Sequence, residues 1–281
     1  MGKCYLTILL LAFVVGVTDG YAHPLEGTIV RQVTNPWGSL VGFGLANDGT
    51  NLYVTGATDG DIRVVDTTTL SVVRTIATPA NYILGLEYHN GVLFASDPHP
   101  GPDKDAASRI YAVDASSGTT LFSFDAPDYS VIGLSMGSDG LLYAMDGYDS
   151  VGSSGSFIYA FDPADGSLVD TIDASDTLWG TDIIEWVGDL FLTDDGYGAS
   201  RLSFYELQGG IIERSYGLSV PGISFQDYRG STLMGDSLYL WGQDSPAILT
   251  QIEVPEPATI LLVGLGAVML RRRTGFLPSQ E

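Results

Sequence analysis

The sequence predicts an all-β fold built from repeats, and three observations support this prediction. The 281 residues include 35 glycines, 13 prolines and 15 tyrosines, a composition that favours short strands joined by tight turns. Short apolar segments recur along the chain at nearly constant spacing. Hydrophobic residues make up 45% of the chain, so stacked repeats can bury a substantial core between them.

Four apolar segments that end in an acidic residue mark the repeat. They are DIRVVD, RIYAVD, FIYAFD and RLSFYE, which end at Asp66, Asp114, Asp162 and Glu206 with spacings of 48, 48 and 44 residues. A strand-like piece precedes each of them (NLYVTG, VLFASD, LLYAMD and DLFLTD), a turn with another apolar piece follows each, and SLYLWG near Tyr239 is a fifth copy of the preceding piece. With the segment that enters each unit, this makes four strands per repeat, the pattern of β-propeller blades.

We predict five four-stranded blades in a body that covers residues 23–254. The fifth repeat stops at AILTQIEV without an outer strand, and the segment GTIVRQV (27–33) is similar to LSVVRTI, the outer strand of the first repeat. Because each blade buries its faces only against its neighbours, the ring must close. We therefore expect the N-terminal segment to complete the last blade.

The first repeat, NLYVTGATDGDIRVVDTTTLSVVRTI, resembles the YVTN β-propeller repeat of bacterial and archaeal surface proteins. The matching pieces are residues 52–55, 64–67 and 72–76, and Gly56 stands where the family has Asn. The resemblance implies a propeller fold and a location at the cell surface. It implies no particular chemistry.

Residues 1–22 have the pattern of a secretory signal peptide. Lys3 precedes an apolar run over 5–17, and Gly20-Tyr21-Ala22 forms a small-x-small cleavage site. We therefore expect export through the Sec translocon, and a buried N-terminal helix is the alternative. The single cysteine, Cys4, lies in this segment, so cleavage after Ala22 leaves a mature chain without disulfides or cysteine metal ligands.

The apolar segment near the C-terminus is short for a membrane span. Residues 258–270 would form a helix about 20 Å long, whereas the hydrocarbon core of a bilayer is about 30 Å thick. Pro255, Glu256 and Pro257 precede this segment, and Arg271, Arg272 and Arg273 follow it. This order resembles the PEP-CTERM sorting signal of Gram-negative bacteria.

The resemblance implies a sorting signal with a transient transmembrane helix over 255–273, followed by a cytoplasmic tail over 274–281. It implies that an exosortase recognises the chain and cleaves it at or near Pro255, Glu256 and Pro257, after which the body is at the cell surface. It also implies an exopolysaccharide or envelope context. The alternatives are a permanent tail anchor, since arginines can snorkel around a short helix, and a helix in the soluble core.

The charge of the chain excludes one class of partner. With 34 acidic and 12 basic residues, the net charge is −22. Such a body repels the phosphates of nucleic acids, so we expect no nucleic-acid partner.

The loops on one face of the predicted ring carry acidic residues at equivalent positions. Asp97, Asp146 and Asp194 each lie three residues after the aromatic residue of their blade. Carboxylates on loops of this kind could bind Ca²⁺, the one cofactor that we consider. Alternatively, each aspartate caps its own turn.

The same face is predicted to carry a cluster of aromatic rings, which come from the segments that enter the inner strands. Such rings with nearby carboxylates can stack on sugars and hydrogen-bond to them, or can pack the core between blades. The candidates are Trp37, Tyr82, Tyr129, Trp179, and Phe225 or Tyr228.

Catalytic residues are harder to find. Glycosidases use paired carboxylates, and Asp182, Glu185 and Asp227 are the candidates for such a pair. We therefore favour a surface module that binds polysaccharide or other surface proteins, or acts as a scaffold. A secreted, glycosidase-like carbohydrate-active enzyme is the alternative.

Overall fold

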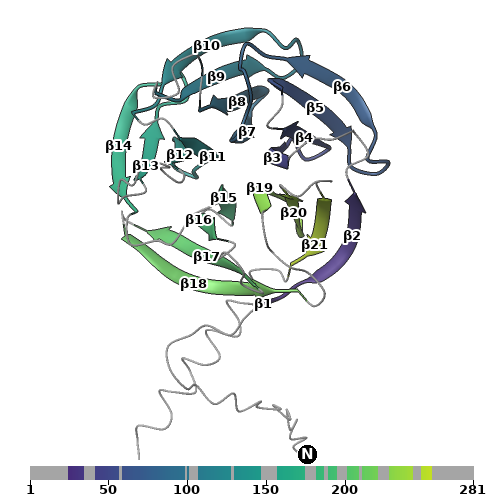
Figure 1. The fold of residues 1–281 in the computed structure, drawn as a ribbon. Helices are drawn as coiled ribbons and strands as arrows, with labels where there is room; N and C mark the ends of the chain where they lie inside the picture. Colours follow the sequence, from purple (N-terminus) through teal and green to yellow (C-terminus); the bar gives the residue numbers. More distant parts are fainter. Residues whose placement is uncertain are drawn as a thin grey trace, which may run out of the picture.

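The computed structural model describes the residues 25–34, 42–56, 59–98, 100, 107–127, 130–146, 157–174, 182–186, 189–194, 201–208, 211–220, 228–242 and 248–254. These residues form strands in five sheets that are arranged as a ring (Figure 1). The predicted all-β propeller fold is confirmed. The predicted signal peptide and C-terminal helix lie outside the described ranges, and within those ranges no helix is long and apolar enough to cross a membrane.

Each sequence repeat forms one sheet, and its strands are ordered from the centre of the ring outward. The first sheet has the order β3 (Gly42–Asn47), β4 (Asn51–Gly56), β5 (Asp61–Asp66) and β6 (Val72–Ala77). The second has β7 (Leu86–His89), β8 (Val92–Asp97), β9 (Arg109–Asp114) and β10 (Thr120–Asp125). The third has β11 (Val131–Met136), β12 (Leu142–Asp146), β13 (Phe157–Phe161) and β14 (Leu168–Asp173).

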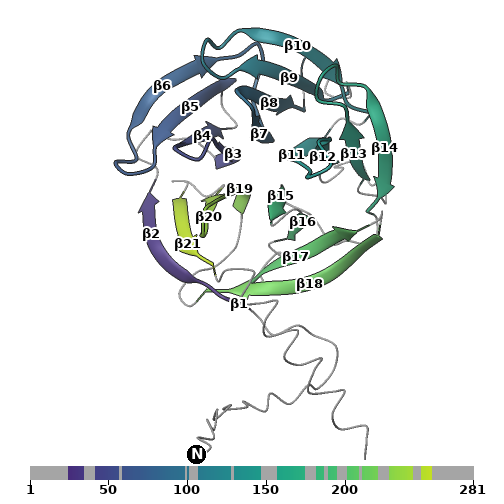
Figure 2. The ribbon, with the colours of Figure 1, turned by 180° about the vertical axis from the view of Figure 1, so that it is seen from behind.

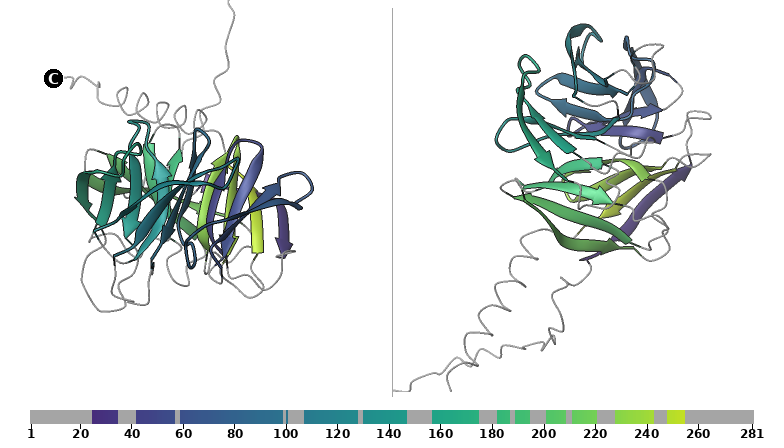
Figure 3. Two further views of the ribbon diagram at one scale, coloured as in Figure 1. Left: turned by 90° about the horizontal axis from the view of Figure 1, so that it is seen from above. Right: turned by 60° about the vertical axis from the view of Figure 1, so that its left-hand side comes forward.

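The last two sheets include the N-terminal strands. The fourth sheet has the order β15 (Asp182–Trp186), β16 (Asp189–Asp194), β17 (Arg201–Gln208) and β18 (Ile211–Ser219), with β1 (Leu25–Glu26) outside β18. The fifth has β19 (Tyr228–Met234), β20 (Ser237–Gly242), β21 (Ile248–Glu253) and β2 (Thr28–Thr34). Figure 3 shows the ring edge-on, with the strands running across its thickness.

The N-terminal strand closes the ring, as the sequence predicts. β2 pairs antiparallel with β21, with Thr28 opposite Glu253 and Thr34 opposite Ile248. The short strand β1 was not predicted. It pairs in parallel with the outer edge of β18, so the segment before β2 crosses to the neighbouring sheet (Figure 2).

Among the described residues, five hydrophobic clusters form the core, and each joins two neighbouring sheets. In one of them Leu45 and Val54 of the first sheet pack with Tyr239 and Trp241 of the fifth. In another, Met145 of the third sheet packs with Ile183 of the fourth. The core is therefore divided among the interfaces between sheets, which is why the ring must be closed to bury all of it.

Buried polar groups connect neighbouring sheets near the axis of the ring, which we call the channel. The hydroxyl of Thr55 in β4 donates to the carbonyl of Ile83, at 3.2 Å, and the hydroxyl of Ser96 in β8 donates to the carbonyl of Val131, at 3.0 Å. Ile83 lies just before β7, and Val131 is the first residue of β11, so each bond reaches the innermost strand of the next sheet. Because these groups are buried, each bond also satisfies a carbonyl that has no access to water.

Arginines connect sheets at the outer rim. Arg31 in β2 donates to the carbonyls of Thr67, at 3.1 Å, and Thr68, at 2.7 Å, in the turn after β5. Arg74 takes the same register position in β6 and donates to the carbonyls of Ala115 and Ser116, in the turn after β9. The closing strand therefore holds both the fifth sheet, through its backbone, and the first sheet, through Arg31.

The aspartates that mark the repeats cap the turns before the outer strands. The carboxylate of Asp114 accepts the backbone N–H groups of Ser116, at 3.0 Å, and Ser117, at 2.7 Å. These bonds and those from the two serine hydroxyls lower the pKa of Asp114 to about 2. Asp66 caps its turn in the same way, which gives the repeated acid a structural role.

Every sheet has a β-bulge in its outermost long strand at the same repeat position. In each of these strands, one residue has no partner in the register with the next strand inward. These bulge residues are Val30, Val73, Leu121, Val169 and Ser215. The four aliphatic members are 52 to 59% exposed. The repeat therefore includes a local bend in the rim that its apolar pattern did not predict.

Candidate functional site

The topology places the predicted binding face at one end of the ring. In each sheet the innermost strand begins beside the end of the second strand, as in the pairs Val131–Asp146 and Tyr228–Gly242. The segments that enter the innermost strands therefore share a face with the loops that follow the second strands. Trp37, Tyr129, Trp179 and Phe225 lie outside the described residues, so their predicted clustering stays a prediction.

Tyr82 is the candidate aromatic residue of this face that the structure describes. It is half-buried, next to Asn81, whose backbone N–H donates to Oδ2 of Asp97 at 2.7 Å. Burial raises the pKa of Tyr82, and the negative charge of Asp97 raises it further. An aromatic ring and a carboxylate are therefore close together here in the second sheet. Tyr228, the alternative to Phe225, is instead a core residue that shares a hydrogen bond with Thr250.

The three aspartates proposed as Ca²⁺ ligands end the second strands of their sheets. Asp97 is fully buried and Asp146 is 3% exposed, while the side chain of Asp194 is outside the description. Asp97 receives a backbone N–H from the segment that enters its own sheet. No group of three acidic or histidine side chains comes together in the part of the chain that the structure describes. The Ca²⁺ site stays a prediction.

Asp182, one of the candidate catalytic carboxylates, lies between two inner strands. It takes the register position that Gly133 and Gly230 hold in their sheets, and it is 6% exposed. Its Oδ2 accepts the backbone N–H of Ser231, at 2.6 Å, and the hydroxyl of Ser231, at 2.8 Å, while Oδ1 accepts the N–H of Ile183, at 2.9 Å. Oδ2 therefore connects β15 to β19, while Oδ1 is satisfied within β15.

The environment of Asp182 differs from that of a catalytic acid exposed to substrate. Burial raises its pKa to about 8, and this effect outweighs the three hydrogen bonds, which favour the ionised form. The side chain of Glu185 and the whole of Asp227 are outside the description, so the proposed pairing of carboxylates is untested. The contacts of Asp182 indicate a structural role.

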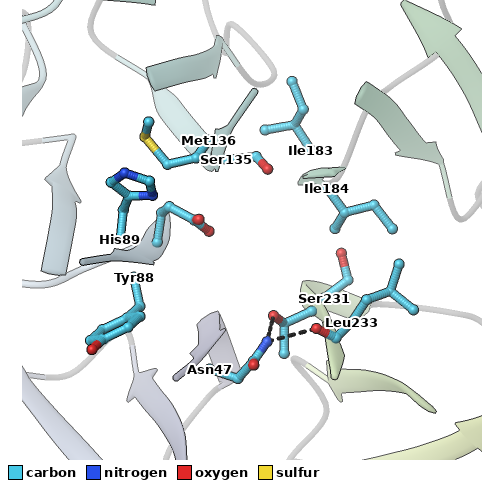
Figure 4. A pocket seen from close by; sticks show the side chains of 11 residues that line it. Asn47, Tyr88, His89, Ser135, Met136, Ile183, Ile184, Ser231 and Leu233 are labelled. Atoms are coloured by element: carbon cyan, nitrogen blue, oxygen red, sulfur yellow. Dashed lines mark hydrogen bonds between the residues drawn. The ribbon is translucent and has the colours of Figure 1, made fainter. Parts of the chain in front are cut away.

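The described residues form a cavity of about 270 Å³ at the opposite end of the channel. All five inner strands contribute, and Asn47, His89 and Met136 are the last residues of β3, β7 and β11 (Figure 4). Among the described residues, the lining consists of Asn47, Glu87, Tyr88, His89, Ser135, Met136, Ile183, Ile184, Ser231, Thr232 and Leu233.

One wall of this cavity is fixed by hydrogen bonds. The side-chain amide of Asn47 donates to the hydroxyl of Thr232, at 2.7 Å, and to the carbonyl of Leu233, at 2.8 Å, as the dashed lines in Figure 4 show. Beside this wall, the ring of Tyr88 stacks on Tyr53 with centroids 5.5 Å apart. The strand ends that surround the cavity are therefore held in place from more than one sheet.

The sequence did not point to this cavity, although a signal was present. Glu87, Ser135 and Thr232 take the same register position, opposite the aromatic residue of the second strand, where Ala46 and Ile184 stand in the other sheets. Such divergence within a repeat can mark a site. Only the register shows at which end of the channel these divergent residues lie.

The ring of sheets and its closing strand define this chain as a β-propeller protein. It carries a PEP-CTERM protein-sorting motif over residues 253–273, which begins at the last residue of β21. The motif implies an exported protein that is anchored in the membrane and then processed by an exosortase. No curated protein matches the sequence.

Solved structures support the fold. Glutaminyl cyclase of Myxococcus xanthus is similar with a TM-score of 0.61 and 10% identity, over 83% of this chain and 100% of that one. A chain of a nidogen/laminin complex is similar with a TM-score of 0.50 and 16% identity, over 73% of each chain. At these identities the likeness concerns the fold alone.

Proposed function

We propose that the chain is a five-bladed propeller that acts at the cell surface as a binding or scaffolding module, in an exopolysaccharide or envelope context. The five sheets support the blade count, with the fourth sheet as a blade to which β1 adds an extra strand. The similarity of the first repeat to the YVTN repeat supports the surface location. We propose the limits 1–22 for the signal peptide, 23–254 for the propeller and 255–273 for the sorting signal.

The last blade is complete before the sorting motif reaches its prolines. Val254 is 5% exposed, and its backbone N–H donates to the carbonyl of Asp236 at 3.0 Å. Cleavage at Pro255, Glu256 or Pro257 would therefore leave β21 and its pairing with β2 intact. We propose that this is the processed position and that the body is released from its transmembrane helix without losing a strand.

Mass spectrometry of the C-terminus of the exported protein tests this proposal. We expect a mature chain that ends within residues 254–257, and an unprocessed chain when Pro255 and Pro257 are both replaced by Ala. A native protein that retains Arg271, Arg272 and Arg273 would overturn the proposal and favour a permanent anchor.

The binding role is argued from Tyr82 at the predicted binding face, whose pKa is raised by the nearby charge of Asp97. The ring of Tyr82 is half-buried and can stack on a sugar, while the fully buried Asp97 holds the backbone N–H of Asn81 beside it. We propose that Trp37, Tyr129, Trp179 and Phe225 extend this arrangement around the channel, and that Ca²⁺ could bind near Asp97 and Asp146.

Glycan-array binding of the full chain, with and without Ca²⁺, tests the binding role. We expect binding that is lost in Trp37→Ala and Tyr82→Ala and kept in Tyr143→Ala, whose ring lies in the second strand of another sheet. Turnover of a bound glycan that disappears in Glu185→Gln would favour the enzyme instead. Binding that is the same in all the variants would show that the aromatic face is not the site.

A further inference from the structure

We propose that the cavity at the carboxyl ends of the inner strands binds a small organic cation, with its ammonium group at Glu87. This goes beyond the proposed function, because the cavity lies at the other end of the channel from the predicted binding face and takes a different class of ligand.

The first argument is the loss of repeat symmetry in the lining. One register position faces the aromatic residue of the second strand in every sheet, and it carries Glu87, Ser135, Thr232, Ile184 and Ala46 in the five sheets. The preceding position stays aliphatic in four sheets, as in Leu86 and Leu134. Packing alone can use the same kind of residue in each repeat, whereas here one carboxylate and two hydroxyls stand at a position that is aliphatic in the other two sheets.

Polar groups reach the cavity from several strands. Figure 4 shows Ser231 on the side formed by β15 and β19, and His89 and Ser135 on the side formed by β7 and β11. Glu87 lies in β7 and also lines the cavity. Because Ile183 and Ile184 are only 1% and 4% exposed, a ligand in this cavity meets mainly polar groups.

Charge decides which polar group fits. Among the lining residues that the structure describes, Glu87 is the acidic one, and none is lysine or arginine. The cavity therefore attracts a cation and disfavours an anion, and the net charge of −22 adds an attractive field at longer range. An ammonium group also donates the hydrogen bonds that a carboxylate and the hydroxyl of Ser135 accept.

Size and rigidity limit the ligand further. A cavity of about 270 Å³ is below the usual range for drug-sized molecules, so the ligand has few heavy atoms. Asn47 holds Thr232 and Leu233 in place, and this fixed wall reduces the entropy that binding would cost.

Isothermal titration of the full chain in detergent, with three probes of similar shape, tests the proposal. n-Butylammonium carries the cation, n-butanol is its neutral counterpart and butyrate its anionic one. We expect n-butylammonium to bind at least about tenfold more tightly than n-butanol, since hydrogen bonds to charged groups exceed neutral ones by this order, and butyrate not to bind. The affinity should fall as the salt concentration rises.

Substitutions place the binding in the cavity. Glu87→Gln should weaken the binding of n-butylammonium at least tenfold. Glu253→Gln makes the same change on an exposed residue outside the cavity and should have no effect. Equal affinity for n-butylammonium and n-butanol in the unsubstituted chain would overturn the proposal even if a variant failed to fold. So would an unchanged affinity in a folded Glu87→Gln. Neither result concerns glycan binding at the other face, so the two proposals fail separately.

Discussion

The buried carboxyl group of Asp182 should make the stability of the ring decrease as the pH rises. Burial raises its pKa from 3.8 to about 8. Between these values the folded protein keeps a proton that the unfolded chain has lost. The free energy of unfolding therefore falls across the window from about pH 4 to about pH 8, by at most about 1.4 kcal/mol per pH unit, and the contribution of Asp182 is constant outside it.

Asp182→Asn separates this effect from the hydrogen bonds of the side chain. An asparagine cannot ionise, so the decrease with pH that is due to Asp182 should disappear. The amide nitrogen of asparagine cannot accept a hydrogen bond, whereas both oxygens of a carboxyl group can, so one of the donors Ile183 N–H and Ser231 N–H loses its partner. This should cost about 1–3 kcal/mol at pH 5, where the carboxyl group of the original protein is neutral.

Urea unfolding at pH 5, 6 and 7 measures both quantities. Asp236→Asn is the control, because Asp236 is exposed in the turn between β19 and β20. The original chain and this control should lose stability in parallel over this range, while Asp182→Asn should lose less. If the difference between the original chain and Asp182→Asn is the same at all three pH values, the reasoning about the buried proton is wrong.

Two further predictions concern how the sheets are joined. Arg31→Ala removes both hydrogen bonds to the turn after β5 and should lower the free energy of unfolding by about 1–3 kcal/mol in urea titrations. The control Arg109→Ala breaks an exposed ion pair with Asp125 and should cost less than about 1 kcal/mol. Similar losses in the two variants would contradict the role given to Arg31. Gly133→Ala would place a Cβ 2.8 Å from Oδ1 of Asp182 and should lower the free energy of unfolding by about 1–3 kcal/mol. Gly242→Ala, whose Cβ would have its nearest neighbour at 3.4 Å, should have little effect in the same urea titrations. Equal effects would show that β11 and β15 can move apart easily.

The repeat made most of the fold predictable from the sequence. The similarity of 27–33 to the outer strand of the first repeat led directly to the pairing of β2 with β21, and Arg31 does take the position of Arg74. The parallel strand β1 could not be predicted, because two residues carry no periodic pattern. The bulges were also missed, since one extra residue per outer strand changes the register without changing the apolar pattern.

The candidate site was less predictable, because it depends on contacts between repeats. Asp182 was a catalytic candidate on account of its acid group and its strand. The register shows that Asp182 stands where two other sheets have glycine. The packing shows that Ser231 in the next sheet donates hydrogen bonds to it. In the sequence, nothing distinguishes Glu87 from the many other acidic residues. Only the structure shows that it lines a cavity formed by the five inner strands.

The repeated bulge has a consequence for how densely such molecules can be displayed. The inner strands of the ring face one another, but the outermost strands form edges whose backbone groups could pair with an edge of a neighbouring molecule, except where β1 already pairs with β18. An extra residue at the same place in each outermost long strand bends that edge, so two rims cannot align flat over a long run of hydrogen bonds. On a crowded surface, this geometry would keep adjacent rings as separate, soluble units instead of letting them join edge to edge into fibres.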